Sequence, residues 1–301
     1  MPRRPLVARV AWTLRDYAKR VWDNSGEDNI FFLAGGIAFN LLLAAVPFAL
    51  LLVAGLGYVL RYSSADATHV VAEILQRLLP PGVSPGEGTL DSLLEGIVES
   101  RGPVGLYSAL LFVWFSTRLF GSLRSVLAEV FDIETDRGIV AGKIFDVQVT
   151  VLATVLLVAY TTLNTYLGIA QSEARAALVG VGLRDDVMGW LEIAAGRVLS
   201  FLFIVLLFYA LYKVLPNRRI RWRTALLAAL FAGVLFELAR GIFTAYVARA
   251  NPGSVYTGAL AVFVVFVIWV YYAAMLFILG GEVAQVYELR RVRRQQREVL
   301  E

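Results

Sequence analysis

Two ionisable residues stand out because they interrupt a long apolar stretch near its middle. Glu237 and Arg240 lie within the hydrophobic segment 225–247, and their three-residue spacing places both on one face of a helix. Charged groups at such a depth in a bilayer are costly and often line substrate or ion paths. Two interpretations stay open: a polar site facing a cavity between helices, or an ion pair that neutralises itself and fixes helix packing.

Amide side chains in other apolar segments could complete such a polar site. Asn40 lies in the first apolar segment, seven residues before Pro47, and two further amides lie in the third. Amides at this depth favour either a wet interior or hydrogen bonds between helices. We predict an intramembrane polar site made of Glu237, Arg240, Asn40, Asn164 and Gln148.

The residue types on which most soluble active sites depend are scarce. The chain has no cysteine and one histidine, which argues against disulfides, thiolate nucleophiles and Cys/His zinc sites. His69 stands alone and is interpreted as a solvated surface residue. No nucleotide-binding loop, Ser/His/Asp set or nucleic-acid patch is present in the sequence. We therefore expect no enzymatic activity, no metal, no cofactor and no specific nucleic-acid partner.

The composition indicates that the elements positioning these residues are membrane helices. Hydrophobic residues make up 58% of the chain and charged residues 17%, and the mean hydropathy is +0.68, more apolar than a soluble domain requires. Six segments are candidate spans of about 20 residues or more. They are Ile30–Leu60, Val104–Val130, Phe145–Ala170, Met188–Leu215, Ala225–Val247 and Tyr256–Tyr287.

The sequence thus predicts an all-α polytopic membrane protein with six transmembrane helices in a single membrane domain, residues 1–301. The second span is the weakest, because its uninterrupted apolar part ends at Thr117 and Arg118 must reach toward an interface. The first span is overlong, so tilt, protrusion or a kink at Pro47 must absorb the excess. The pair Gly280-Gly281 permits close helix approach in the sixth.

The distribution of basic residues predicts the orientation of these spans. The formal net charge is +4, and 20 of the 28 Lys and Arg residues lie in the segments on one side, against six on the other. Basic segments stay in the cytoplasm, so both termini are expected there. A cytoplasmic basic rim is expected to hold anionic lipid headgroups; its residues are Arg118, Arg218, Arg219, Arg221 and Arg223.

Three flanking segments have their own patterns. Residues 1–29 predict a basic amphipathic helix, which either lies in the headgroup layer or packs on the bundle. The acidic segment 61–103 has two stretches of helical spacing separated by Pro80-Pro81-Gly82, and predicts an external two-helix cap. Residues 288–301 form a basic cytoplasmic tail.

Two carboxylates lie near the cytoplasmic ends of the third and sixth spans. Asp146 and Glu282 occupy these positions, and the nearby cations are Arg118, Arg124 and Lys143. We expect ion pairs between the two groups, with a structural role.

The order of residues in the C-terminal half resembles the YihY/BrkB family of bacterial membrane proteins. Its marks are Pro216-Asn217 and Trp222-Arg223 before the fifth span, Glu237, Phe243 and Tyr246 on it, and Trp269, Tyr271, Gly280 and Glu282 on the sixth. The segments GGIAFNLLLAAVPFALLL and LLFVWFSTRLFGSLRSVLAEVFD are similar to the family's first two spans, so the resemblance covers about residues 30 to 287. Asn40 and Thr257 depart from the family pattern.

The resemblance implies a six-helix inner-membrane protein of a family historically labelled a ribonuclease, with members tied to envelope lipid handling. Our first hypothesis is a transporter or lipid-handling protein whose partners are membrane lipids. The second is a scaffold that docks an envelope protein through the 61–103 cap. A nuclease ranks last, because the cytoplasmic loops are basic and lack the carboxylates or histidines that RNA cleavage needs.

Overall fold

The computed structural model of the chain describes residues 6–59, 101–134, 138, 140–156, 185–250 and 259–300. These residues form helices, and no strand occurs among them. The all-α prediction is therefore confirmed for this part of the chain. Asn164 and nearly all of the predicted 61–103 cap lie outside the described residues.

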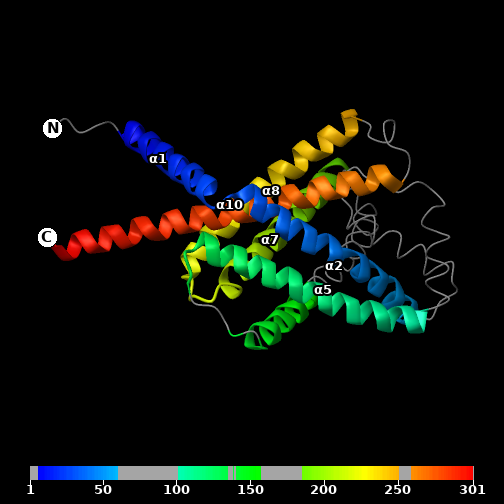
Figure 1. Cartoon of the computed structure of the whole chain (residues 1–301). Helices are drawn as coiled ribbons and strands as arrows, with labels where there is room; N and C mark the ends of the chain where they lie inside the picture. Colours follow the sequence, from blue (N-terminus) through cyan, green and yellow to red (C-terminus); the bar gives the residue numbers. More distant parts are fainter. Residues whose placement is uncertain are drawn as a thin grey trace.

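The helices are long, and five of the six predicted apolar segments each lie largely within one of them (Figure 1). Of the third predicted segment, Phe145–Ala170, the structure describes only residues 145–156. They are α1 (Leu6–Glu27), α2 (Ile30–Val59), α5 (Arg101–Val130), α7 (Asp185–Val214), α8 (Trp222–Ala250) and α10 (Ala259–Leu300), with a further helix over residues 140–156. The helix α2 continues through Pro47. The basic tail from residue 288 is a continuation of α10 rather than a separate segment.

Four of the described helices are long and apolar enough to cross a membrane. The candidate spans are Ile30–Leu51, Gly105–Val130, Trp222–Arg249 and Phe263–Arg293, and a shorter apolar helix covers Val198–Val214. The second predicted span is thus stronger than expected, because its helix continues without a break past Thr117 to Val130. Multiple spans are established, and the count of six stays a prediction.

The helix α10 is the centre of the bundle and contacts α1, α2, α5 and α8. Two glycines on α10 allow the closest approaches. A Cβ atom at Gly280 would lie 2.9 Å from the Cβ of Ala232 on α8, and one at Gly281 would lie 3.1 Å from a methyl group of Val130 on α5. The predicted role of this glycine pair in close helix packing is confirmed.

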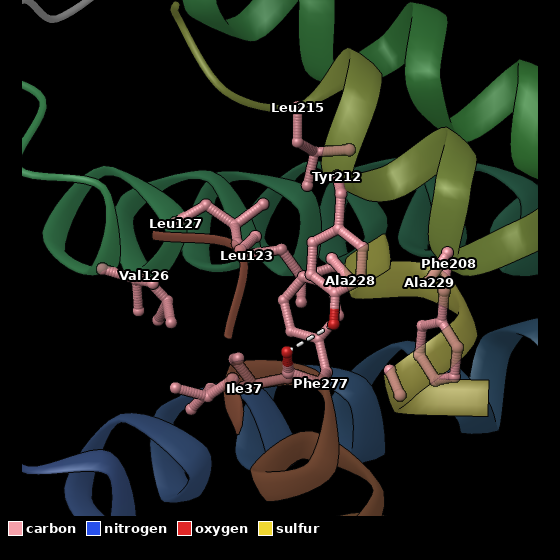
Figure 2. Close-up of a cluster of buried hydrophobic side chains, with 14 of the residues drawn as sticks. Ile37, Leu123, Val126, Leu127, Phe208, Tyr212, Leu215, Ala228, Ala229 and Phe277 are labelled. Carbon is pink, nitrogen blue, oxygen red and sulfur yellow. Dashed lines mark hydrogen bonds between the residues drawn. The ribbon is translucent and has the colours of Figure 1, made fainter. Parts of the chain in front are cut away.

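A buried aromatic cluster joins α7 to α10 (Figure 2). The rings of Tyr212 and Phe277 stack with centroids 5.0 Å apart, and the Tyr212 hydroxyl donates a hydrogen bond of 2.6 Å to the Phe277 carbonyl oxygen. A fully buried phenol needs such a partner. Because the acceptor is a backbone carbonyl, this contact fixes the depth of α7 against α10.

The helix α1 is docked on the C-terminal half of α10. Arg290 bonds to Asp16 and lies over the Tyr17 ring, 3.8 Å from its centroid, and the Asn24 amide donates to Gln285 Oε1 at 2.9 Å. Asn29, with φ of 49°, forms the turn into α2. Two interpretations of the N-terminal amphipathic helix were open. The structure shows the one in which this helix packs on the bundle.

Candidate functional site

An open groove of about 600 Å³ lies between α7 and α8 and contains the predicted charged pair. The helix α7 contributes one aliphatic and one aromatic side chain, and one face of α8 contributes the polar groups. The lining residues are Val198, Phe201, Glu237, Arg240, Gly241 and Thr244. Spacings of three, four and seven residues place the four α8 residues on a single helix face.

Glu237 and Arg240 form an ion pair within this groove. Arg240 Nη2 lies 2.9 Å from Glu237 Oε2, and the two side chains are 38% and 26% exposed, respectively. The other carboxylate oxygen, Glu237 Oε1, is buried and has no hydrogen-bond partner among the described residues. The two interpretations of the pair are therefore combined: the charges neutralise each other, and they also face a groove rather than a dry core.

The pair lies deep along the helix and opens to an apolar surface. At about 1.5 Å per residue, Glu237 is about 20 Å from either end of α8. The side chains around the groove are aliphatic and exposed, with Val198 and Leu238 at 58% and Ile242 at 71%. In a membrane helix such side chains contact acyl chains, so the groove opens laterally toward lipid.

Two of the three predicted amides, Asn40 and Gln148, do not lie at the charged pair. The Asn40 amide donates to the Gly36 carbonyl one turn earlier in its own helix, at 2.9 Å, which satisfies it locally. Gln148 is exposed on the 140–156 helix, and neither residue is among the described residues that line the groove. Sequence position gave the depth of these amides but not the helix face they occupy.

Sequence reasoning missed the other lining residues of the groove. Thr244 follows Glu237 by seven residues and donates from its hydroxyl to the Arg240 carbonyl at 2.8 Å. Its spacing was a usable signal, since residues seven apart share a helix face. Nothing in the sequence indicated Val198 or Phe201, because their place depends on how α7 packs on α8.

The predicted basic rim divides into separate parts. Arg218 forms a 2.9 Å ion pair with Glu288 of α10, and the Arg223 guanidinium lies 5.1 Å from the Trp222 ring centroid. Arg219 and Arg221 are exposed in the same connection between α7 and α8. Arg118 instead lies on α5, where it lines a different groove together with Lys143.

The two carboxylates near span ends have different surroundings. Asp146 pairs with Arg124 at 3.3 Å across the α5 interface, which confirms one expected ion pair. Glu282 is fully buried, and its neighbours among the described residues are the carboxyls of Asp28 and Asp132 and the amide of Asn24, with no arginine or lysine among them. The expected pairing of Glu282 is wrong because α1 and its connection to α2 fold back over this end of α10. Within the described residues, no group of three or more histidines, cysteines or carboxylates is arranged to hold a metal ion.

The sequence of this chain is similar to those of bacterial membrane proteins. A UPF0761 membrane protein of Chlorobium phaeobacteroides is 29% identical over 265 residues, which are 87% of this chain and 55% of the relative. One of Janthinobacterium is 24% identical over 257 residues, 85% of this chain and 56% of the relative. One of Vibrio cholerae is 27% identical over 260 residues, 85% of this chain and 82% of the relative.

The chain therefore spans little more than half the length of the first two relatives. No solved structure matches it. The family model described as Virulence factor BrkB matches residues 21–299. This match covers nearly the whole chain, from the last turns of α1 almost to the end of α10. The chain is a multi-pass membrane protein that belongs to the BrkB family.

Proposed function

We propose that the protein binds and moves an amphiphilic lipid of the inner membrane through the groove between α7 and α8. The observation that carries this proposal is the Glu237–Arg240 ion pair, which lies near the middle of a membrane helix and lines an open groove. A pair with a purely structural role would be expected in a closed interface between helices. An exposed pair at this depth offers a polar group where lipid offers none.

The chemistry of the groove fits a headgroup that carries phosphate. The Arg240 guanidinium can bind phosphate oxygens through two parallel hydrogen bonds. The Glu237 side chain is 26% exposed, and a carboxylate can accept a hydrogen bond from an ammonium or hydroxyl group. The acyl part of the ligand would contact Val198 and Phe201, which form the other wall. This role involves binding and movement only, and no bond-breaking step is assigned to these residues.

The proposed orientation has both termini in the cytoplasm. It rests on the excess of basic residues in the segments predicted to be cytoplasmic. The arrangement of the helices agrees with it, since α1 and the C-terminal part of α10 lie at the same end of the molecule (Figure 1). Headgroups would enter the groove from a leaflet and leave toward the other one.

Reconstitution into liposomes with fluorescently labelled phospholipid tests this function. We expect the double variant Glu237→Gln with Arg240→Gln to move lipid at least about tenfold more slowly, because charged hydrogen bonds to the headgroup are lost. The charge-exchanged variant Glu237→Arg with Arg240→Glu keeps a neutral pair on the same helix face. It should retain thermal stability and still lose activity, because the two charges have changed places in the groove.

Gln148→Leu provides the matched control, since it removes an exposed polar group from a different membrane helix. It should leave lipid movement unchanged. No acceleration of lipid movement by the wild-type protein would contradict the proposed function itself. Full activity of the charge-exchanged variant would show instead that the pair only stabilises helix packing.

A further inference from the structure

A second groove, of about 480 Å³, lies between α5 and the 140–156 helix. Its wall consists of apolar and aromatic side chains on α5, and two cationic side chains reach it from the two helices. The lining residues are Leu110, Val113, Trp114, Thr117, Arg118 and Lys143. None of these residues lines the groove of the Glu237–Arg240 pair.

The two cations of this groove have no acidic partner among the described residues. Arg118 and Lys143 are both exposed, and the nearby carboxylate Asp146 is already bonded to Arg124 at 3.3 Å. Lys143 lies in the first turn of its helix, and Arg118 lies in the second half of α5, so both belong to the end of the bundle that is predicted to be cytoplasmic. Two positive charges without an acidic partner in the described part of the chain thus line one cavity.

The rest of the groove is apolar and runs along α5. Leu110 and Trp114 are each 64% exposed, and Val113 is exposed between them. Trp114 and Leu110 lie four and eight residues before Arg118, which places them on the same helix face as Arg118. Leu110 lies about 12 Å along the helix from Arg118. The groove therefore has a cationic end and an apolar end, with Trp114 at the boundary, where tryptophan is common in membrane proteins.

We infer that this groove is a binding site for an anionic phospholipid. Its phosphate would contact Arg118 and Lys143, and the first part of an acyl chain would lie along Leu110, Val113 and Trp114. Basic pockets between membrane helices on the cytoplasmic side bind anionic headgroups in this way. A free phosphate or nucleotide would use the two cations but would gain nothing from the apolar wall. The site stands whether or not the α7–α8 groove moves lipid.

Binding of phosphatidylglycerol to the purified full-length protein, followed by native mass spectrometry, tests the site. Each surface cation contributes about fivefold to the binding of anionic lipid, so Arg118→Gln with Lys143→Gln should weaken it about 30-fold. Binding of phosphatidylcholine should not change. The matched control Arg15→Gln with Lys19→Gln removes two exposed cations from α1 and should bind phosphatidylglycerol like the wild type.

Equal loss in both double variants would overturn the site, because it would show only general attraction of the lipid. Competition by soluble glycerol phosphate as effective as that by phosphatidylglycerol would also overturn it, in favour of a free phosphate ligand. A photoactivatable phosphatidylglycerol tests the wild-type protein directly and does not depend on the folding of a variant. Crosslinks should map to residues 110–118 and 140–147, and crosslinks confined to other helices would contradict the inference.

Discussion

Arginines in the membrane helices of this protein differ in what satisfies their charge. Arg240 bonds to Glu237 one turn away on its own helix, and Arg124 bonds to Asp146 on another helix. Arg118 faces a groove without an acidic partner among the described residues. The first pair is accessible and the second is nearly buried. The same residue type is therefore accessible in a groove in one place and buried between helices in another.

The buried pair should matter most for stability. The side chains of Arg124 and Asp146 are 14% and 2% exposed, so removal of one partner leaves an uncompensated charge. We expect Asp146→Asn or Arg124→Gln to lower the free energy of unfolding by about 3–5 kcal/mol. Thermal unfolding in detergent, with wild-type protein alongside, measures this.

Two further variants separate the pair from general effects of charge removal. Arg124→Met with Asp146→Leu removes both charges and should cost less than either single change. Arg20→Gln breaks the pair with Asp16, whose side chains are 43% and 27% exposed, and should change stability little. A double variant less stable than both single variants would contradict this account.

Whether the sequence predicts one of these contacts depends on how far apart the two residues lie along the chain. The Arg124–Asp146 contact was expected because both residues flank one short connection between consecutive spans. The neighbours of Glu282 were not, because Asp28 and Asp132 come from segments more than 100 residues away. Hydropathy indicates how deep in the membrane a residue lies. The packing of the helices determines which helix faces contact each other.

At the scale of helices, α5 shows why the second predicted span was underestimated. A count of apolar residues treats Arg118 and Arg124 as interruptions, yet the helix continues unbroken to Val130. Arg124 is neutralised by Asp146, and Arg118 lies at a groove where its long side chain can reach polar surroundings. The spacing of residues predicted the helix. Only the structure shows the surroundings that make the charges of Arg118 and Arg124 tolerable within it.

Close packing of α7, α8 and α10 depends on Gly280. A side-chain atom there would meet the Tyr212 hydroxyl and lie 2.9 Å from the Ala232 Cβ. Since both neighbours belong to packed helices, Gly280→Ala should destabilise the protein by about 1–3 kcal/mol. A fall in the midpoint of thermal unfolding in detergent would show this.

The control for that prediction is Gly35→Ala, because no atom lies within 4 Å of the position of its Cβ. Alanine also favours helix, so this change should be neutral or slightly stabilising. Adding Tyr212→Phe to Gly280→Ala removes the hydroxyl that the new methyl group would meet. The double variant should be more stable than the sum of the single effects predicts, and simple additivity would argue against the proposed clash.

At the scale of the whole molecule, the directions of the helices agree with the predicted topology (Figure 1). The helix α2 runs away from the end where α1 lies, α5 returns to it, α8 runs away again and α10 returns. The sequence predicted this alternation from basic residues alone. It did not predict that α1 docks on α10, because one amphipathic pattern fits a lipid surface and a helix surface equally well.

The absence of cysteine allows a direct test of the orientation. Single variants Lys19→Cys, Arg219→Cys and Gln296→Cys place a thiol on exposed positions of α1, the α7–α8 connection and α10, and Arg249→Cys places one near the other end of α8. In intact spheroplasts, a membrane-impermeant maleimide should label only Arg249→Cys. The first three should react after the membrane is opened. Labelling of Lys19→Cys in intact spheroplasts would show the opposite orientation, with the Arg118–Lys143 groove in the outer leaflet. Equal labelling of Arg219→Cys and Arg249→Cys in intact spheroplasts would contradict a membrane-spanning α8.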